Sequence, residues 1–161
     1  MGLLNSLVQE YTRQLGKGQI QKAYRGIMSF MSGLKLHLSG LYPNFSTSAL
    51  YFGYMDMTYF AFTPTELREK KLKVAIVYLH EEARFDAWLG GINRQIQAAV
   101  IDQLSQKNIG GYQLSQVQPG VDSIIETMLV AQPDFDNPDA LKQQIETRVI
   151  EFVTDMMALL D

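Results

Sequence analysis

The stretch from Lys71 to Leu104 constrains the fold of this chain more than any other. Residues 72–79 alternate between two faces that are both largely apolar, which is typical of a strand with neighbours on both sides. After a short polar loop, residues 84–89 alternate again, and Gly90-Gly91 follows. Over residues 92–104 the apolar spacing becomes helical. We therefore expect two strands joined as a hairpin, a sharp glycine turn, and a helix.

Two helices are expected before this stretch. The first has a helical stripe that Gly16-Lys17-Gly18 interrupts: Leu3, Leu4, Leu7, Val8, Tyr11 and Leu15. The second has apolar residues from Ile20 to Leu38 on one side, and Gly40 and Pro43 end it. Residues 44–48 are expected to form a polar loop.

A strand rich in aromatic residues is expected at 50–62, with Asp56 as its single charge. Its methionines and aromatic residues are most simply core side chains. Thr63-Pro64-Thr65-Glu66 has the pattern of a capping box, in which Thr63 caps a short helical turn and Glu66 closes the box. This turn links the aromatic strand to the strand at 72–79.

The C-terminal third predicts a strand, a short helix and a last helix. Residues 112–117 fit a short strand, and residues 121–129 follow a helical period more closely than alternation. Asn137 and Pro138 begin the last helix as its cap and first residue. The sequence thus predicts one α+β domain over residues 1–161, in the order helix-helix-strand-strand-strand-helix-strand-helix-helix. We expect a mixed four-stranded sheet whose strand–helix–strand unit makes a parallel pair.

Composition narrows the class of protein. The net charge of −3 argues against a nucleic-acid partner, because such proteins normally carry a basic surface. The chain has no cysteine, which excludes disulfides, thiolate chemistry and zinc–cysteine sites. No apolar run approaches the length of a bilayer span, and the N-terminus lacks a signal-peptide pattern. We expect a cytoplasmic protein with no membrane partner and no cofactor.

The first candidate site combines Asp56, Arg84, Asp86 and Trp88. If the three strands pair as neighbours, these side chains gather on one face of the sheet. In the functional interpretation they line a polar pocket, where Arg84 holds an anion and the carboxylates hold a cation or a proton. In the structural interpretation Arg84 forms an ion pair with an aspartate, because a buried charge must be paired.

The second candidate site follows the double glycine, at Asn93 and Arg94. A helix that begins after glycines presents free N–H groups and the positive end of its dipole, which suits an anion. No phosphate-loop pattern is present, so a tight strand-to-helix turn explains the glycines equally well. The two histidines, His37 and His80, have no second histidine or cysteine at metal-ligand spacing. We interpret His80, with Glu81 and Glu82, as the solvated tip of a hairpin rather than a metal site, and we expect no metal site.

Four segments together resemble a known family: QKAYRGIMSFMSGLK (21–35), YFGYMDMTYFAFTP (51–64), KVAIVYLHEEARFDAWLGGINRQIQ (73–97) and GVDSIIETMLVAQPDFDNPDALKQQIE (120–146). The chain resembles uncharacterised bacterial proteins that are known only as a domain of unknown function. The resemblance covers nearly the whole chain and implies a single-domain bacterial protein. It implies no activity and no catalytic residue.

The expected order of elements is also similar to the core of the restriction-endonuclease-like nucleases. That similarity implies an aspartate on the second core strand and a Glu/Asp-x-Lys on the third. The third strand here has Asp86-Ala87-Trp88, with tryptophan in place of lysine, and residues 74–78 contain no acid. These departures count against metal-dependent cleavage.

Three functions remain open from the sequence. One is a non-catalytic binding module that takes a small molecule or a protein at Asp56, Arg84, Asp86 and Trp88. Another is a divergent hydrolase or nuclease in which Asp56 and Asp86 hold Mg²⁺. The third is self-association as a homo-oligomer through the aromatic strand or the last helix.

Overall fold

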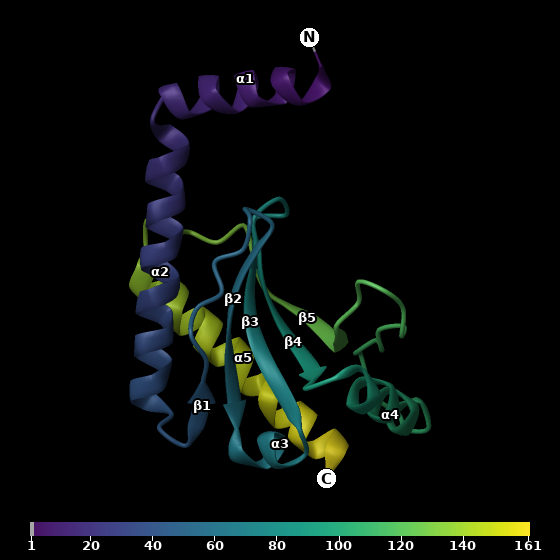
Figure 1. Cartoon of the computed structure of the whole chain (residues 1–161). Coiled ribbons are helices and arrows are strands. Elements are labelled where there is room, and N and C mark those ends of the chain that lie inside the picture. Colours follow the sequence, from purple (N-terminus) through teal and green to yellow (C-terminus); the bar gives the residue numbers. More distant parts are fainter. Residues whose placement is uncertain (1) are drawn as a thin grey trace.

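The fold is built around one antiparallel sheet of five strands. The computed structural model describes residues 2–161, and its strands follow one another in the sheet as they do in the chain (Figure 1). Each neighbouring pair is antiparallel, from β1–β2 to β4–β5. The strands are β1 (Phe45–Thr47), β2 (Met57–Pro64), β3 (Leu72–Leu79), β4 (Arg84–Gly91) and β5 (Ser123–Ala131).

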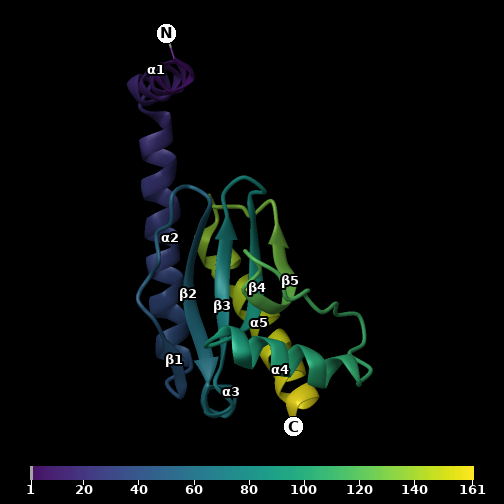
Figure 2. The ribbon, with the colours of Figure 1, turned by 45° about the vertical axis from the view of Figure 1, so that its right-hand side comes forward.

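Two long helices form a layer on one face of this sheet, α2 (Gln19–Leu41) and α5 (Pro138–Leu160) (Figures 1 and 2). The short α3 (Thr65–Glu69) links β2 to β3. Helix α4 (Arg94–Ser105) follows β4 and lies at one end of the sheet, next to the ends of β4 and β5 (Figures 1 and 2). Helix α1 (Leu3–Gly16) projects from the start of α2, away from the sheet. Within the described residues, no helix combines the length and the apolar character that a bilayer span needs.

The core lies between the sheet and the two long helices. Alternate side chains of β2, β3 and β4 enter it, including Phe60, Ile76 and Phe85, which are fully buried. The helices contribute stripes at helical spacing: Met31, Leu34 and Leu38 from α2, and Leu141, Ile145, Val149, Phe152 and Met156 from α5. Because these stripes are one-sided, each helix buries one face against the sheet and exposes the other.

The hairpin and the helix expected in the central stretch are confirmed, but the sharp turn expected at the double glycine is wrong, because Gly90 and Gly91 both belong to β4. Strand β3 has the bounds expected for it, and β4 begins at Arg84 and continues through both glycines. The last helix begins at Pro138 with Asn137 as its N-cap residue, although the Asn137 side chain makes no capping hydrogen bond.

The predicted mixed sheet is wrong, because β5 pairs with β4 in the antiparallel direction. Residues 112–117 are not a strand, and only Leu114 makes an isolated bridge to Ile125. Residues 121–129 are not a helix, since most of them belong to β5. Two irregularities in the β4–β5 register make consecutive residues buried, first Ile124-Ile125 and then Leu129-Val130. Such bulges break the alternation of a strand, and here the remaining spacing imitates a helical stripe.

The aromatic strand begins later than expected, at Met57. Before it, Tyr51 makes a bridge to Tyr59, and residues 52–56 form a tight turn. Gly53 is required in this turn, because it has a φ of +77° and a Cβ there would lie 2.0 Å from the Met57 carbonyl oxygen. The loop expected at 44–48 contains β1, which pairs with the end of β2.

The capping box at 63–66 is also wrong, although the helical turn is present as α3. The N-cap residue of α3 is Pro64, and no side chain caps the helix. Thr63 is buried, and its Oγ1 accepts a hydrogen bond of 3.1 Å from the Val74 N–H of β3. The hydroxyl therefore joins two strands instead of capping a helix.

Gly91 and Gly90 offer a matched test of why β4 ends in glycines. A Cβ on Gly91 would lie 2.8 Å from the Gln97 backbone nitrogen, whereas a Cβ on Gly90 would lie 3.4 Å from the Asp122 carbonyl oxygen. We expect Gly91→Ala to lower the free energy of unfolding in urea by about 1–3 kcal/mol, the usual effect of overpacking. Gly90→Ala should change it by less. Equal effects of the two substitutions would contradict the close approach of α4 to β4.

Candidate functional site

The face of the sheet opposite α2 and α5 has no long helix over most of its length (Figure 2). A hollow of about 500 Å³ lies on this open face. Strand alternation brings Tyr59 from β2, Val77 from β3 and Trp88 from β4 to its floor. The complete lining is Tyr51, Asp56, Met57, Tyr59, Lys73, Ala75, Val77, Trp88, Gly90, Gly91, Ile92, Asn93, Arg94, Gln97, Asp122 and Ser123.

Arg84, Asp86 and Trp88 form one hydrogen-bonded row on the open face of β4. Arg84 Nε donates to Asp86 Oδ1 at 3.1 Å, and Trp88 Nε1 donates to Asp86 Oδ2 at 3.2 Å. The Asp86 side chain is 3% exposed, so its charge is paired where water hardly reaches it. The hollow is lined by Trp88 and not by Arg84 or Asp86. The Asp86 carboxylate, which is paired with Arg84, therefore fixes the position of the Trp88 indole, and the indole ring faces the hollow.

Asp56 lies apart from this row, in the turn before β2. Its Oδ1 accepts a 2.9 Å hydrogen bond from the Tyr54 N–H. Hydrogen bonds from the backbone N–H groups of Tyr54, Met57 and Asp56 itself lower the pKa of this carboxyl. No hydrogen bond or ion pair within residues 2–161 joins Asp56 to Arg84 or Asp86. The expected four-residue cluster is thus a triad, with Asp56 as a separate turn residue at the edge of the hollow.

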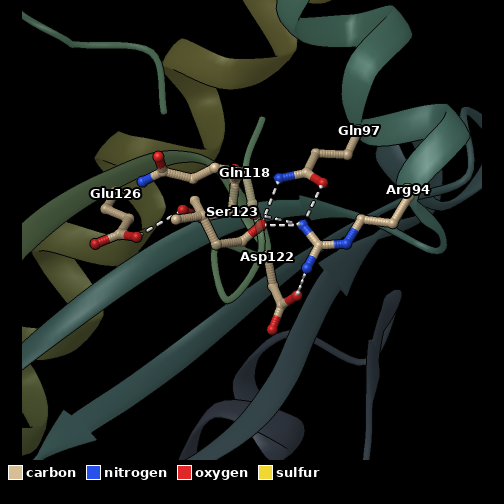
Figure 3. A network of polar contacts seen from close by, with 7 residues as sticks. Arg94, Gln97, Gln118, Asp122, Ser123 and Glu126 are labelled. Atoms are coloured by element: carbon tan, nitrogen blue, oxygen red, sulfur yellow. Dashed lines mark hydrogen bonds and ion pairs between the residues drawn. The ribbon is translucent and has the colours of Figure 1, made fainter. Parts of the chain in front are cut away.

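Asn93 and Arg94 lie at the opposite end of the hollow, where α4 begins. Asn93 Oδ1 accepts a 2.8 Å hydrogen bond from the Ile96 N–H and so caps the helix. Figure 3 shows Arg94 pointing to the segment before β5, where its Nη2 lies 3.1 Å from Asp122 Oδ1. These contacts fit the turn interpretation of this region, since both side chains hold the helix start in place.

Gln97 completes the attachment of α4 to the sheet. This side chain is 1% exposed, and its Nε2 donates to the carbonyl oxygens of Val121 at 2.9 Å and Ser123 at 3.0 Å (Figure 3). Arg94 Nη1 donates to the same Val121 carbonyl and to Gln97 Oε1. This network gives hydrogen-bond donors to two backbone carbonyls, that of Val121 before β5 and that of Ser123 at its start.

The aromatic wall of the hollow was not found from the sequence. The sequence predicts Tyr51, Met57 and Tyr59 as core side chains, but they lie on the open face, while Phe60 and Phe62 enter the core. The rings of Tyr51 and Tyr59 have centroids 4.9 Å apart. Both faces of this strand are apolar, so alternation alone cannot say which one is open. Lys73, which alternates on the same face, was the available signal.

The metal-dependent alternative gains no support from the geometry. Asp86 is engaged by Arg84 and Trp88, and the carboxylate of Asp56 by backbone N–H groups of its turn. Among the described residues, no three His, Asp or Glu side chains are grouped so that they could hold a metal ion. The similarity to the nuclease fold is not shown. The arrangement is suited to holding a flat apolar group against aromatic rings, with charged groups at its ends.

Comparison with known proteins gives a family but no function. A family model described as Domain of unknown function (DUF7000) matches residues 4–160. This confirms the resemblance to an uncharacterised family. No curated protein matches the chain, and no solved structure matches it either.

A comparison of two aspartates that pair with arginines, Asp86 and Asp122, tests the structural role of the triad formed by Arg84, Asp86 and Trp88. Asp86 is almost fully buried, whereas the Asp122 side chain is 82% exposed. We expect Asp86→Ala to lower the free energy of unfolding by about 1–3 kcal/mol, because it leaves the Trp88 N–H and Arg84 without an acceptor. Asp122→Ala should cost under about 1 kcal/mol, as for exposed pairs. Urea denaturation measures both, and the same small effect for each variant would argue against a structural role for Asp86.

His80 predicts a pH dependence of stability. Its Nε2 lies 2.8 Å from Thr58 Oγ1, and its ring stacks on Tyr24. Burial lowers the pKa of His80, and the Asp56 carboxylate offsets part of this effect. A lowered pKa means that the unfolded chain binds the proton more readily. The stabilisation that comes from keeping His80 neutral is therefore complete above the ordinary histidine pKa of about 6.5. It is lost as the pH falls towards the pKa of His80 in the folded state.

We therefore expect the urea concentration at the unfolding midpoint to decrease when the pH is lowered from 7 to 5. The decrease should be smaller in His80→Gln, which keeps a hydrogen-bond donor for Thr58. The stabilisation from the Asp56 carboxyl, whose pKa is lowered, is complete above its ordinary value of about 3.9, so it is lost only below that value and does not change between pH 7 and pH 5. An equal pH dependence in the two proteins would show that burial does not hold His80 neutral.

Proposed function

We propose that this chain, which belongs to the DUF7000 family, is a non-catalytic cytoplasmic module that binds a small planar organic ligand on its open sheet face. The observation that carries the proposal is the hollow over Trp88, on the face of the sheet that α2 and α5 leave uncovered. Its volume of about 500 Å³ lies within the range of about 300–1,000 Å³ for small-molecule sites. A chain without cysteine also suits a reducing compartment.

The wall of the hollow supports a flat, apolar ligand. Tyr51, Tyr59 and Trp88 offer aromatic rings, and Met57 adds a flexible thioether that adapts to irregular shapes. The Trp88 indole is held by Asp86, so it needs no ordering when a ligand stacks on it. Preorganised aromatic surface is the feature that favours binding here.

The charges around the hollow support an anionic group on the ligand. Lys73 is exposed at the end near Gly90, and no ion pair within residues 2–161 involves it. Arg94 lies at the same end but is paired with Asp122. A carboxylate, sulfonate or phosphate near Lys73 would gain an ion pair without breaking one.

The titratable groups favour binding over catalysis. Asp56 is the lining residue whose pKa departs clearly from its ordinary value, and the direction is downward. Hydrogen bonds inside its own turn account for that direction. A general acid or base at neutral pH needs a carboxyl pKa that is raised towards 7. Asp56 is therefore an ionised turn residue and is not poised for proton transfer.

The single tryptophan allows a direct binding test, since Trp88 is the only fluorescent indole in the chain. The probe is 8-anilinonaphthalene-1-sulfonate, an aromatic anion with a flat naphthalene ring. We expect saturable energy transfer from Trp88 to the bound probe. Lys73→Ala should weaken binding by up to about fivefold, which corresponds to one partly exposed ion pair.

A pair of matched substitutions locates the site. Ala75 lies on the floor of the hollow, and Ala131 lies outside its lining at the end of β5. Ala75→Glu should abolish the energy transfer by occupying the hollow and repelling the anion, whereas Ala131→Glu should leave it unchanged. Energy transfer that is absent in the natural protein, or that survives Ala75→Glu, would refute the proposed site.

A further inference from the structure

Helix α1 presents an apolar stripe that no other part of the described chain covers. Among its residues, none is buried. The stripe comprises Leu3, Leu4, Leu7, Val8 and Tyr11, whose exposed fractions lie between 49% and 78%. In both views α1 points away from the sheet and meets the body only at the start of α2 (Figures 1 and 2). An isolated helix of 14 residues is marginal in water, so packing on its apolar side would stabilise it.

The joint between α1 and α2 holds the stripe away from the core. Gly18 has a φ of +76° and is the N-cap residue of α2, so the chain turns sharply here. The Gln21 side chain donates a 2.9 Å hydrogen bond back to the Leu15 carbonyl, which fixes the bend. The stripe thus has a defined position outside the core.

The accessible surface of the chain is larger than that expected for a compact protein of the same mass. It is 9795 Å², whereas a compact monomer of 18.2 kDa exposes about 8,100 Å². The excess of about 1,700 Å² is more than the roughly 800 Å² that each partner buries in a standard interface. The excess for the whole chain is therefore of the size that a stable dimer interface needs, and α1 with the start of α2 is the part that projects from the body (Figure 1).

We propose that the α1 stripe is the interface through which two copies of this chain form a symmetric dimer. Leu4, Val8, Tyr11 and Leu15 follow one another at intervals of four, three and four residues, which is the spacing of a coiled-coil seam. In a twofold dimer the same surface is used by both copies, so one self-complementary stripe is sufficient.

A second copy fits this stripe better than a lipid surface does. Helices that lie on membranes carry lysine and arginine along their polar side. Arg13 is the one basic residue of α1, and it is paired with Glu10, with Arg13 Nη2 2.5 Å from Glu10 Oε1. The remaining polar side is made of uncharged residues such as Asn5, Gln9 and Thr12. The polar side therefore lacks the positive charge that would draw it to anionic headgroups.

The test is sedimentation equilibrium of the full chain at tens of micromolar. We expect a mass near twice 18.2 kDa for the natural protein. Leu4→Glu with Val8→Glu should give a monomer, because it places charges in the seam. The matched control, Asn5→Glu with Gln9→Glu, adds the same charge on the polar side and should remain a dimer. Since α1 contributes no buried residue, the thermal unfolding midpoint of the body should be unchanged in both.

Cross-linking identifies the surface independently of the mass. The chain has no natural cysteine, so Val8→Cys and Gln9→Cys each introduce a single thiol. A short bismaleimide should link Val8→Cys into covalent dimers and leave Gln9→Cys largely monomeric. A monomeric natural protein, a dimer that survives the two seam substitutions, or binding of the monomer to phosphatidylserine vesicles through the same residues would overturn the proposal.

Discussion

The packing of α2 and α5 against one face of the sheet determines what the other face can be. Two one-sided apolar stripes meet the buried side chains of β2, β3 and β4, and each large side chain removed from water contributes about 1.5–3 kcal/mol. An antiparallel sheet needs only one covered face, because its other face can meet solvent. The open face is therefore free to carry aromatic side chains that serve no purpose in the core.

Two polar networks give the open face its shape. Asp86 binds Arg84 and Trp88 on β4, so one charge is paired and the indole is oriented by the same carboxylate. At the end of the sheet, Arg94 and Gln97 bind the Val121 carbonyl before β5, Gln97 also binds the Ser123 carbonyl at its start, and these contacts hold α4 beside the hollow. Because Gln97 is buried and its amide is satisfied, this end is expected to be rigid. Both networks position the hollow, and Asp86 and Arg84 stay outside its lining while Arg94 and Asp122 line it as an ion pair.

The sequence predicted the parts of this structure that depend on local pattern. Strict alternation in 84–89 placed Arg84, Asp86 and Trp88 together, and the structure has them on one side of β4. The sequence analysis failed where contacts between distant parts of the chain determine the structure. The bulges in β5 imitate a helix, and the turn at 52–56 removes Asp56 from the strand. The side of Tyr59 does not follow from residues 57–64, because it depends on which face α2 and α5 cover, and the signal for that face, Lys73, lies on the neighbouring strand.

The central claim is that a planar anion occupies the open face beside Trp88. The most direct measurement is the two-dimensional ¹H–¹⁵N spectrum of the chain during titration with 8-anilinonaphthalene-1-sulfonate, since the one tryptophan gives one indole N–H signal. We expect saturable shifts of that signal and of amides in 73–77 and 88–94, while amides of α5 stay unchanged. Shifts confined to α1, or an indole signal that does not move, would contradict it.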